Sequence, residues 1–162
     1  MDKNALSLNL ESATEKDVIN LHGWFTNILE IRQWGGPSMD FPISVMQFIA
    51  ETKLDQLNSY KIVDHKNNML AFGQCYQRLE RCHLARLVVS PDARGKGLGK
   101  YLVEQLMLYA PKSITTKGFS LFVLANNTVA RTLYEKLGFR CIDYPEPMDS
   151  TMAECEYLIK DN

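Results

Sequence analysis

The segment from Val88 to Lys100 constrains this chain more than any other part of its sequence. An apolar run ends at Pro91, a cationic and glycine-rich turn follows, and an amphipathic helix is expected to begin directly after that turn. Such an order places unpaired backbone N–H groups and the positive end of a helix dipole at one point. Arg94, Lys96 and Lys100 add positive charge there. The segment therefore predicts a site for a pyrophosphate or a similar anion.

Two common phosphate-binding motifs do not fit this turn. A Walker A loop would need glycine where Arg94 stands and a hydroxyl side chain of Ser or Thr where Tyr101 stands. A dinucleotide fingerprint that began at Gly95 would need a third glycine where Lys100 stands. The spacing that is present has an arginine followed by glycines three and five residues later. Taken alone, such a turn is equally compatible with a solvated basic connection between a strand and a helix.

A second segment, further along the chain, also carries a recognisable pattern. Residues 121–125 form a short apolar run bounded by turn-forming residues, which predicts a buried strand. Asn126 or Asn127 is a suitable N-cap for the helix that follows, and Gly138 is suited to end it. Tyr134 comes seven residues after Asn127. That spacing is about two helical turns, so both side chains are expected on roughly the same side of the helix.

Together the two segments resemble the signatures of the GNAT superfamily of acetyl-CoA-dependent N-acetyltransferases. The first signature reads Val-Val-x-Pro-x-x-Arg-Gly-x-Gly-Leu-Gly over residues 88–99. The second reads Asn-x-x-Ala-x-x-Leu-Tyr-Glu-Lys-Leu-Gly-Phe over residues 127–139. The detailed resemblance covers roughly residues 82–141, and the remainder agrees only in the order of its expected elements. It implies an α/β fold of the GNAT-like acyl-CoA N-acyltransferase type, with a mixed and partly splayed sheet.

The expected elements follow the order β-α-α-β-β-β-α-β-α-β-β within one N-acetyltransferase domain that covers residues 1–162. Thr14 and Asp17 resemble an acidic capping box at the start of the first helix. Hairpin turns are expected at residues 67–68 and 80–81. The expected bounds are a strand at 6–10, a helix from 14 to the break at 34–37, a helix from the cap Ser44 to 54, strands at 58–64, 69–79 and 82–89, a helix from 97 to Pro111, a strand at 121–125, a helix at 128–137, and strands at 139–144 and 152–159.

The resemblance implies that acetyl-CoA is the cosubstrate and that its pyrophosphate lies on the glycine-rich turn. The residues that would form this turn are Arg94, Gly95, Lys96, Gly97, Leu98, Gly99 and Lys100. Backbone groups near Leu87, Val88 and Val89 would pair with the pantetheine arm as if it were an additional strand. A main-chain N–H in that stretch would polarise the thioester carbonyl.

By the same resemblance, Asn127 would hold the pantetheine or pyrophosphate region through its side-chain amide. Tyr134 matches the position of the family's general acid, which protonates the departing CoA thiolate. The alternative role for Tyr134 is that of an aromatic side chain packed between helix and sheet. The catalytic role therefore stays a prediction at this point.

The general base that would take a proton from the amine is left open by the sequence. The strand before the first signature, residues 82–87, contains no carboxylate. His83 has a suitable intrinsic pKa, Glu80 lies just before the strand, and a water relay or an amine that arrives neutral is equally allowed. The absence of a carboxylate also motivates a second hypothesis, a catalytically silent acyl-CoA-binding or sensing module. A third is that the turn binds a different phosphorylated ligand.

The amine acceptor, a small molecule or a protein, is not identified by the sequence, because one fold serves many acceptors. By resemblance, residues 32–41 and 144–150 would border the acceptor site. Their aromatic residues and carboxylates would suit a cationic amine with an apolar part, and solvation of loop residues explains the same carboxylates. Those carboxylates are Asp40, Asp143, Glu146 and Asp149.

Charge and cysteine usage exclude several other classes of function. A net charge of −1 gives no basic field for nucleic acid or anionic membranes, and no apolar run is long enough to span a membrane. The N-terminus lacks the apolar core of a secretory signal, so we expect a cytoplasmic protein.

The chain has four cysteines, each in an expected strand: Cys75, Cys82, Cys141 and Cys155. They form no C-x-x-C pair, which favours four reduced thiols over a zinc site that includes His83. We expect no metal. Relatives often dimerise, so a homodimer is compatible with the sequence, which itself leaves the oligomeric state open.

Overall fold

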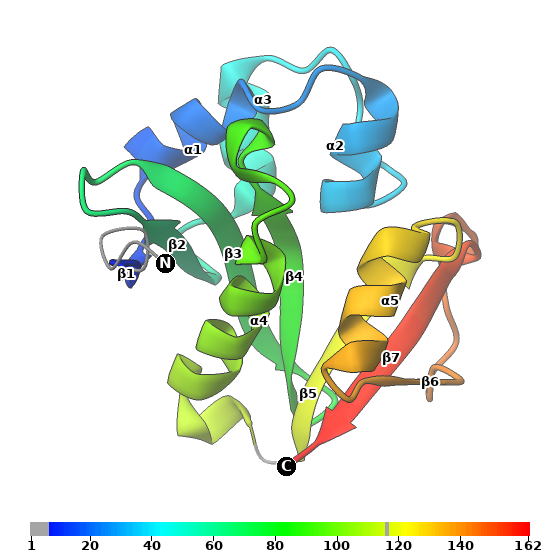
Figure 1. Ribbon diagram of the computed structural model, residues 1–162. Helices are drawn as coiled ribbons and strands as arrows, with labels where there is room; N and C mark the ends of the chain where they lie inside the picture. Colours follow the sequence, from blue (N-terminus) through cyan, green and yellow to red (C-terminus); the bar gives the residue numbers. More distant parts are fainter. Residues whose placement is uncertain (1–6, 116) are drawn as a thin grey trace.

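A computed structural model describes residues 7–115 and 117–162 as a seven-stranded mixed sheet with helices on both faces (Figure 1). The strands lie in the order β1-β2-β3-β4-β5-β7-β6. No described helix is both long and apolar enough to cross a membrane. In chain order the elements are β1 (Asn9–Ser12), α1 (Glu15–His22), α2 (Ile28–Gly35), α3 (Val45–Thr52), β2 (Asn58–Val63), β3 (Met69–Arg78), β4 (Arg81–Val89), η2 (Pro91–Ala93), α4 (Leu98–Tyr109), η3 (Lys112–Ile114), β5 (Gly118–Leu124), α5 (Thr128–Lys136), β6 (Arg140–Ile142), η4 (Ser150–Met152) and β7 (Cys155–Asp161), where η marks a single turn of 3₁₀-helix.

The expected element order is confirmed except in its first helix, which the structure divides into two. The predicted capping box is present, because the backbone N–H of Thr14 donates to the Asp17 carboxylate at 2.8 Å. The helix then ends at His22, ahead of Gly23, a residue that costs helical stability. Asn27 starts α2 by accepting a hydrogen bond from the backbone N–H of Glu30 at 2.9 Å. Three helices, rather than the two expected, therefore lie between β1 and β2.

Three smaller differences concern turns and strand ends. The β3–β4 turn is formed by Leu79 and Glu80, with φ angles of 50° and 62°, rather than by residues 80–81. The last two strands are shorter than expected, since β6 ends at Ile142 and residues 150–152 form a 3₁₀ turn ahead of β7. The first strand was expected near Leu6; that residue lies outside the described part of the chain, and β1 begins at Asn9. None of these shifts changes the strand order.

Strands β4 and β5 pair only at one end and then separate (Figure 1). The parallel register joins residues 82–84 of β4 to residues 119–121 of β5, and no further pair follows. Just beyond this point, β4 carries an extra residue, so that Arg86 and Leu87 lie opposite Gly73 of β3. Arg86 has a φ of 52°, and such a bulge bends the strand that contains it. The predicted splay of the sheet is therefore confirmed, and beyond residue 84 the edge of β4 that faces β5 has no strand partner.

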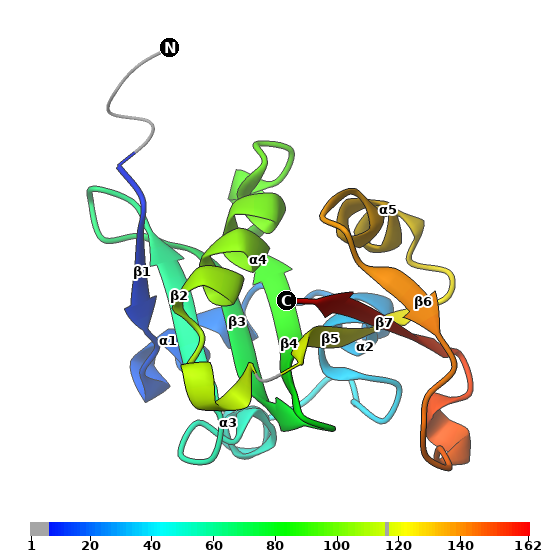
Figure 2. The ribbon, with the colours of Figure 1, turned by 90° about the horizontal axis from the view of Figure 1, so that it is seen from below.

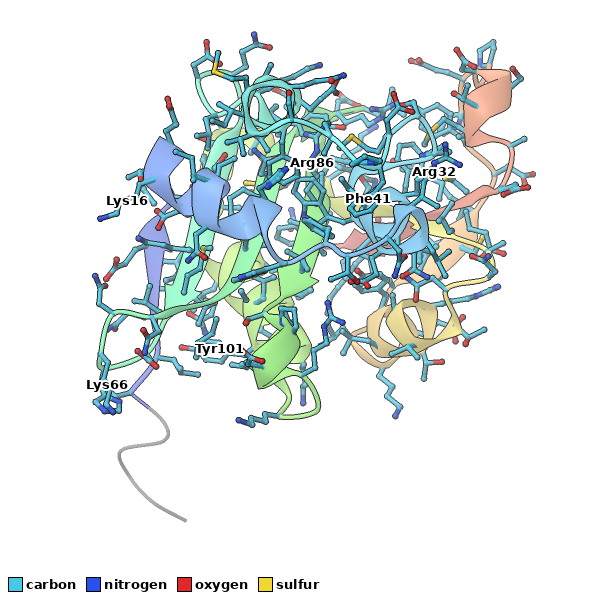
Figure 3. The ribbon with its side chains drawn as sticks, turned by 90° about the horizontal axis from the view of Figure 1, so that it is seen from above. Lys16, Arg32, Phe41, Lys66, Arg86 and Tyr101 are labelled. Carbon is cyan, nitrogen blue, oxygen red and sulfur yellow. The ribbon has the colours of Figure 1, made fainter. Side chains whose placement is uncertain are left out.

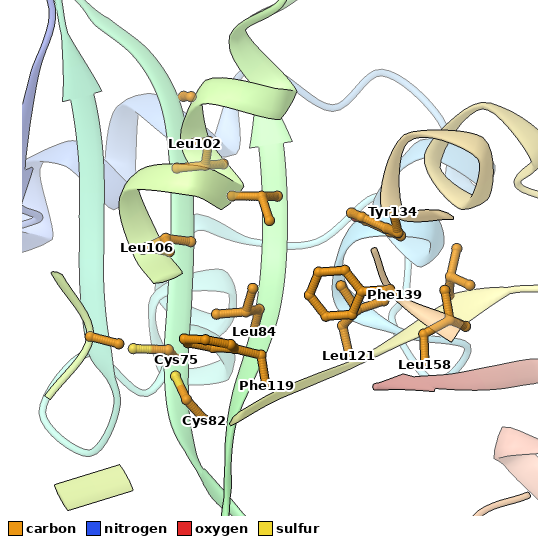
Figure 4. Close-up of a cluster of buried hydrophobic side chains, with 14 of the residues drawn as sticks. Cys75, Cys82, Leu84, Leu102, Leu106, Phe119, Leu121, Tyr134, Phe139 and Leu158 are labelled. Carbon is orange, nitrogen blue, oxygen red and sulfur yellow. The ribbon is translucent and has the colours of Figure 1, made fainter. Parts of the chain in front are cut away.

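Two clusters of buried side chains hold the helices against opposite faces of the sheet. One lies beneath α4 and α5, the other beneath α1, α2 and α3 (Figure 2). Within the first cluster, Leu102 and Leu106 belong to the α4 side of the gap, whereas Tyr134 and Phe139 belong to the α5 side (Figure 4). Phe119 lies near the closed end, where β4 and β5 still pair (Figure 4). The core therefore holds α4 against β4 and α5 against β5, and beyond the paired residues no backbone hydrogen bonds join the described residues of the two strands.

All four cysteines lie in strands, as predicted, and all are free thiols. Cys75 and Cys82 are buried in the core beneath α4. Cys141 is exposed and Cys155 is partly buried. Within the described residues, no group of three or more His, Cys, Asp or Glu side chains is arranged to hold a metal ion.

Ser44 is the predicted N-cap of α3, and its hydroxyl oxygen accepts a hydrogen bond from the backbone N–H of Gln47 at 3.1 Å. Ser44→Ala should lower the free energy of unfolding by about 1 kcal/mol, because an N–H at the helix start loses its acceptor. Denaturant titration measures the change, and Ser44→Asn, which retains an acceptor, should stay close to the parent. Equal losses in both variants would contradict the capping role.

Candidate functional site

A cleft of about 320 Å³ opens where β4 and β5 diverge. One wall comes from β4 and α4, the other from β5 and α5, and α2 closes one end. The sequence-predicted residues that line this cleft are Leu87, Val88, Val89, Arg94, Gly99, Asn127 and Tyr134. Both sequence signatures therefore meet in one cavity although they are separated along the chain.

The glycine-rich turn presents its backbone N–H groups without internal partners. Among the described residues, none of the N–H groups from Arg94 to Lys100 donates a hydrogen bond to the protein. Gly97 has a φ of 79° and precedes the first residue of α4, and no side chain caps this helix. The positive φ explains the glycine, because residues with a Cβ rarely adopt it. Open N–H groups and the helix dipole together make this turn suited to bind an anion.

The other predicted members of the turn have different surroundings. Lys96 and Leu98 line a separate hollow on the far side of the turn, and the side chain of Leu98 is buried there. Lys100 forms an exposed ion pair with Glu104 at 3.8 Å, and Arg94 donates from Nε to the carbonyl of Val89 at 3.4 Å. Arg94 is thus the basic side chain of this turn that lines the cleft.

Asn127 and Tyr134 lie on the α5 wall of the cleft, as their spacing predicted. The side-chain oxygen of Asn127 accepts from the backbone N–H of Ala130 at 3.4 Å and so caps α5. Tyr134 is buried with its ring 6.2 Å from that of Phe139, and its hydroxyl makes no hydrogen bond to another described residue. Burial raises the pKa of Tyr134 to about 12. The phenol therefore keeps its proton at neutral pH and can donate it.

Helix α2 lines the cleft with Trp34, from the segment 32–41 that was expected to border the acceptor site, and with Glu30, to which the sequence analysis assigned no role. Trp34 is fixed by a hydrogen bond from its Nε1 to the carbonyl of Arg86 at 2.8 Å and lies at the end of the cleft. Glu30 also lines the cleft, where its carboxylate accepts from Thr26 Oγ1 at 2.7 Å and from Asn27 Nδ2 at 2.8 Å. Only the tertiary fold brings α2 against the β4 bulge, so no local pattern indicated Glu30.

A second cavity, of about 280 Å³, lies on the opposite face of the same strands. It shares Gln33, Trp34 and Phe122 with the cleft, so the two spaces meet where β4 and β5 separate. Arg86 and Arg32, which line the second cavity, are on one side of the sheet, and Tyr101 of α4 is on the other (Figure 3). The expected carboxylates of the bordering loops are exposed and line neither cavity; they are Asp40, Asp143, Glu146 and Asp149.

His83 lines the second cavity, whereas Glu80 lines neither space. The imidazole is buried, and its Nδ1 lies 2.8 Å from the hydroxyl oxygen of Ser120. Burial first, and the positive charge of Arg78 second, lower the pKa of His83 to about 3. Glu80 is exposed on the β3–β4 turn and forms an ion pair with Lys117 at 2.5 Å. His83 is therefore neutral at physiological pH. Of the two residues considered as general base, only His83 lines one of these two cavities.

The lowered pKa of His83 leads to a pH-dependence that can be measured. Because the folded-state pKa lies below the unfolded value, the unfolded chain binds the extra proton first as the pH falls. Stability from this residue is therefore complete above about pH 6.5 and is lost progressively toward pH 3. In an NMR titration the ring signals of His83 should not move between pH 8 and pH 5. A midpoint in that range would contradict the prediction.

Comparison with known proteins agrees with this geometry. The sequence profile of the Acetyltransferase (GNAT) family matches residues 25–139. The chain belongs to this family. The match includes α2, both signatures and every described wall of the cleft between β4 and β5.

Two curated relatives are acetyltransferases of Salmonella typhimurium. The peptidyl-lysine N-acetyltransferase YjaB is 40% identical over 58 residues, 36% of this chain and 36% of that protein. The [ribosomal protein bS18]-alanine N-acetyltransferase is 33% identical over 102 residues, 61% of this chain and 65% of that protein. The chain thus matches roughly one third to two thirds of the length of these relatives.

Solved structures match over almost the whole chain. The spermidine N-acetyltransferase from Vibrio cholerae, in complex with CoA and spermine, has a TM-score of 0.71 at 15% identity, with 94% of each chain covered. A domain from Methanocaldococcus jannaschii has a TM-score of 0.75 at 16% identity, covering 96% of this chain and 98% of that one. At this level of identity the comparison shows that the fold is shared.

Proposed function

We propose that the protein is an N-acetyltransferase that moves the acetyl group of acetyl-CoA directly to a primary amine in a ternary complex. The observation that carries the proposal is the meeting of an open anion-binding turn, an unpaired strand edge and a protonated tyrosine in one cleft. Membership of the GNAT family supports the same reaction. The curated relatives, whose names describe transfer to lysine and alanine amines, are consistent with it.

The chain's own groups fit the parts of acetyl-CoA. The turn from Arg94 to Lys100 would bind the pyrophosphate through backbone N–H groups and the guanidinium of Arg94. The open edge of β4 around Leu87, Val88 and Val89 would pair with the amide groups of the pantetheine arm. Asn127, on the α5 wall, would contact the same arm from the other side of the cleft.

Acetyl-CoA supplies an activated acyl group when bound, and the protein residues then handle charge and protons. A backbone N–H of the β4 edge would stabilise the negative charge that develops on the carbonyl oxygen. As the amine nitrogen bonds to the carbonyl carbon, the carbon–sulfur bond breaks and Tyr134 would donate a hydrogen bond to the sulfur as negative charge develops on it. Water carries away the proton that the amine loses, because His83 is too weak a base and Glu80 lines neither cavity.

Two further properties belong to the proposal. We infer that the described residues act as one domain, since a single sheet joins β1 near the start of the chain to β7 near its end. We also infer a cytoplasmic setting, which the unpaired cysteines support.

The test measures acetyl-CoA binding by calorimetry and thiol release with a panel of primary amines. The proposal expects binding, followed by amine-dependent release of CoA and a product heavier by one acetyl group. Binding with no release for any amine would favour the silent acyl-CoA-binding module instead. Absence of binding would overturn both readings of the cleft and favour another phosphorylated ligand at the turn.

A further inference from the structure

The second cavity has an unusual charge pattern for a site that accepts amines. Three arginines line it, Arg32, Arg78 and Arg86, and no aspartate or glutamate does. None of these arginines forms an ion pair with a carboxylate among the described residues. The cavity wall is therefore cationic, and no carboxylate of the described residues lines it or forms an ion pair with these arginines.

Arg86 is the strongest indication of an anionic ligand, because its guanidinium is buried and one of its nitrogens has no hydrogen-bond partner. Its Nη1 donates to the side-chain oxygen of Gln74 at 3.1 Å, and its guanidinium lies 5.8 Å from the centre of the Trp34 ring. Its Nε is buried and has no hydrogen-bond partner. Burial lowers the pKa of the Arg86 guanidinium, although Tyr76 and Glu51 act in the opposite direction. A buried cation without a counterion is costly, so an anion from outside would stabilise it.

Arg78 faces the same cavity and is held in place by neutral groups. Its Nε donates to the hydroxyl of Tyr144 at 2.9 Å and its Nη1 to the hydroxyl of Tyr76 at 3.2 Å. The guanidinium also lies 4.9 Å from the centre of the Phe122 ring. Its orientation is thus fixed while its charge stays unpaired. Fixed guanidinium groups of this kind are suited to bind carboxylates or phosphorus oxyanions.

The rest of the cavity wall sets the size and polarity of the ligand. Trp34, Phe122, Leu124 and Met152 provide apolar surface, and His83 is neutral. The volume of about 280 Å³ suits a small molecule rather than a folded partner. The cavity also meets the proposed acetyl-CoA cleft at Trp34 and Phe122, so a ligand held here can present an amine to the acyl group.

We propose that the acceptor is a small amine that carries its own anionic group, a carboxylate or a phosphorus oxyanion, and an apolar body. This inference rests on the proposed N-acetyltransferase function and names the substrate class of that site. Arg86 and Arg78 bind the anionic group and direct the amine toward the opening between β4 and β5. Polyamines and other amines without an anion are disfavoured, because the cationic wall repels them.

The experiment compares amines that differ in one group. Phenylalanine, its carboxamide, 2-phenylethylamine, the phosphonate analogue of phenylalanine and spermidine are assayed by thiol release with the full-length chain. The better of the two anionic amines should exceed the carboxamide in kcat/KM by about 10- to 100-fold, as expected for a charge-assisted contact. The carboxylate and phosphonate arms distinguish the two kinds of anion.

Arg86→Gln and Arg78→Gln should each reduce this preference toward unity, and unchanged affinity for acetyl-CoA, measured by calorimetry, shows that each variant is folded. Arg140→Gln, an exposed arginine that lines neither cavity, is the matched control and should keep the preference. If spermidine or 2-phenylethylamine is the better substrate, the inference is overturned while the proposed function stands.

A second readout covers the case in which no amine in the panel is acetylated. Anionic amines should still raise the melting temperature of the acetyl-CoA complex, and Arg86→Gln should abolish that rise. If acetyl-CoA binds but no anionic amine does, the substrate class is overturned. If acetyl-CoA itself does not bind, the proposed function fails instead.

Discussion

Arg94→Glu is expected to weaken acetyl-CoA binding by about 100-fold, because a charge-assisted contact is lost and a like charge is placed beside the phosphates. Arg94 is the basic side chain of the glycine-rich turn that lines the cleft. The backbone N–H groups around it have no internal acceptors, so the new carboxylate would also compete with the pyrophosphate for these donors. Calorimetry with acetyl-CoA measures the change directly.

Lys66→Glu provides the matched control for this charge reversal. Lys66 is exposed on the β2–β3 turn and lines neither cavity, so its reversal changes the net charge equally without touching the cleft. Its binding constant should stay close to that of the parent protein. If both variants lose affinity to the same extent, long-range charge rather than a contact at the turn explains the effect, and the assignment of Arg94 is wrong.

The walls of the cleft were predictable from the sequence because their signals are local. A glycine at positive φ, an uncapped helix start and an asparagine N-cap are each properties of a few consecutive residues, and Gly97 and Asn127 show them as expected. The seven-residue spacing from Asn127 to Tyr134 fixes a common helix side without any tertiary information. Asn127 and Tyr134 therefore both line the cleft, together with Arg94 and Gly99 of the turn.

The second cavity was predicted in part: residues 32–38, which line it, belong to the segment expected to border the acceptor site, but long-range packing decides its charge. Arg86 lies in an apolar run and gives no local sign of its role; the bulge opposite Gly73 decides where it lies. Trp34 lies in α2, a helix separate from α1, and donates a hydrogen bond to the carbonyl of Arg86 in the bulge. The sequence analysis expected one long helix here and so did not predict this contact. The carboxylates of the loops suggested a cationic acceptor, yet in the structure they are exposed, and arginines line the cavity instead.

Tyr134→Phe should lower kcat for acetyl transfer by about 100-fold or more, since general acid catalysis typically contributes that much. The hydroxyl has no hydrogen-bond partner among the described residues, so its removal leaves no protein group unsatisfied. The ring, which packs against Phe139, is retained, and acetyl-CoA affinity should change little. Steady-state kinetics and calorimetry together separate the two quantities.

The pKa of Tyr134 also indicates how its hydroxyl acts in the reaction. Burial raises it to about 12, so the phenol is a weak acid that acts by hydrogen bonding as negative charge develops on sulfur. Tyr109→Phe, which alters an exposed tyrosine outside both cavities, should leave kcat unchanged. A parental rate in Tyr134→Phe would remove this residue from the acid role and leave it as a packing residue. A fall in affinity with unchanged kcat would instead place the hydroxyl against the pantetheine arm. Loss of an interaction that is equally strong in the ground state and in the transition state raises KM and leaves kcat unchanged.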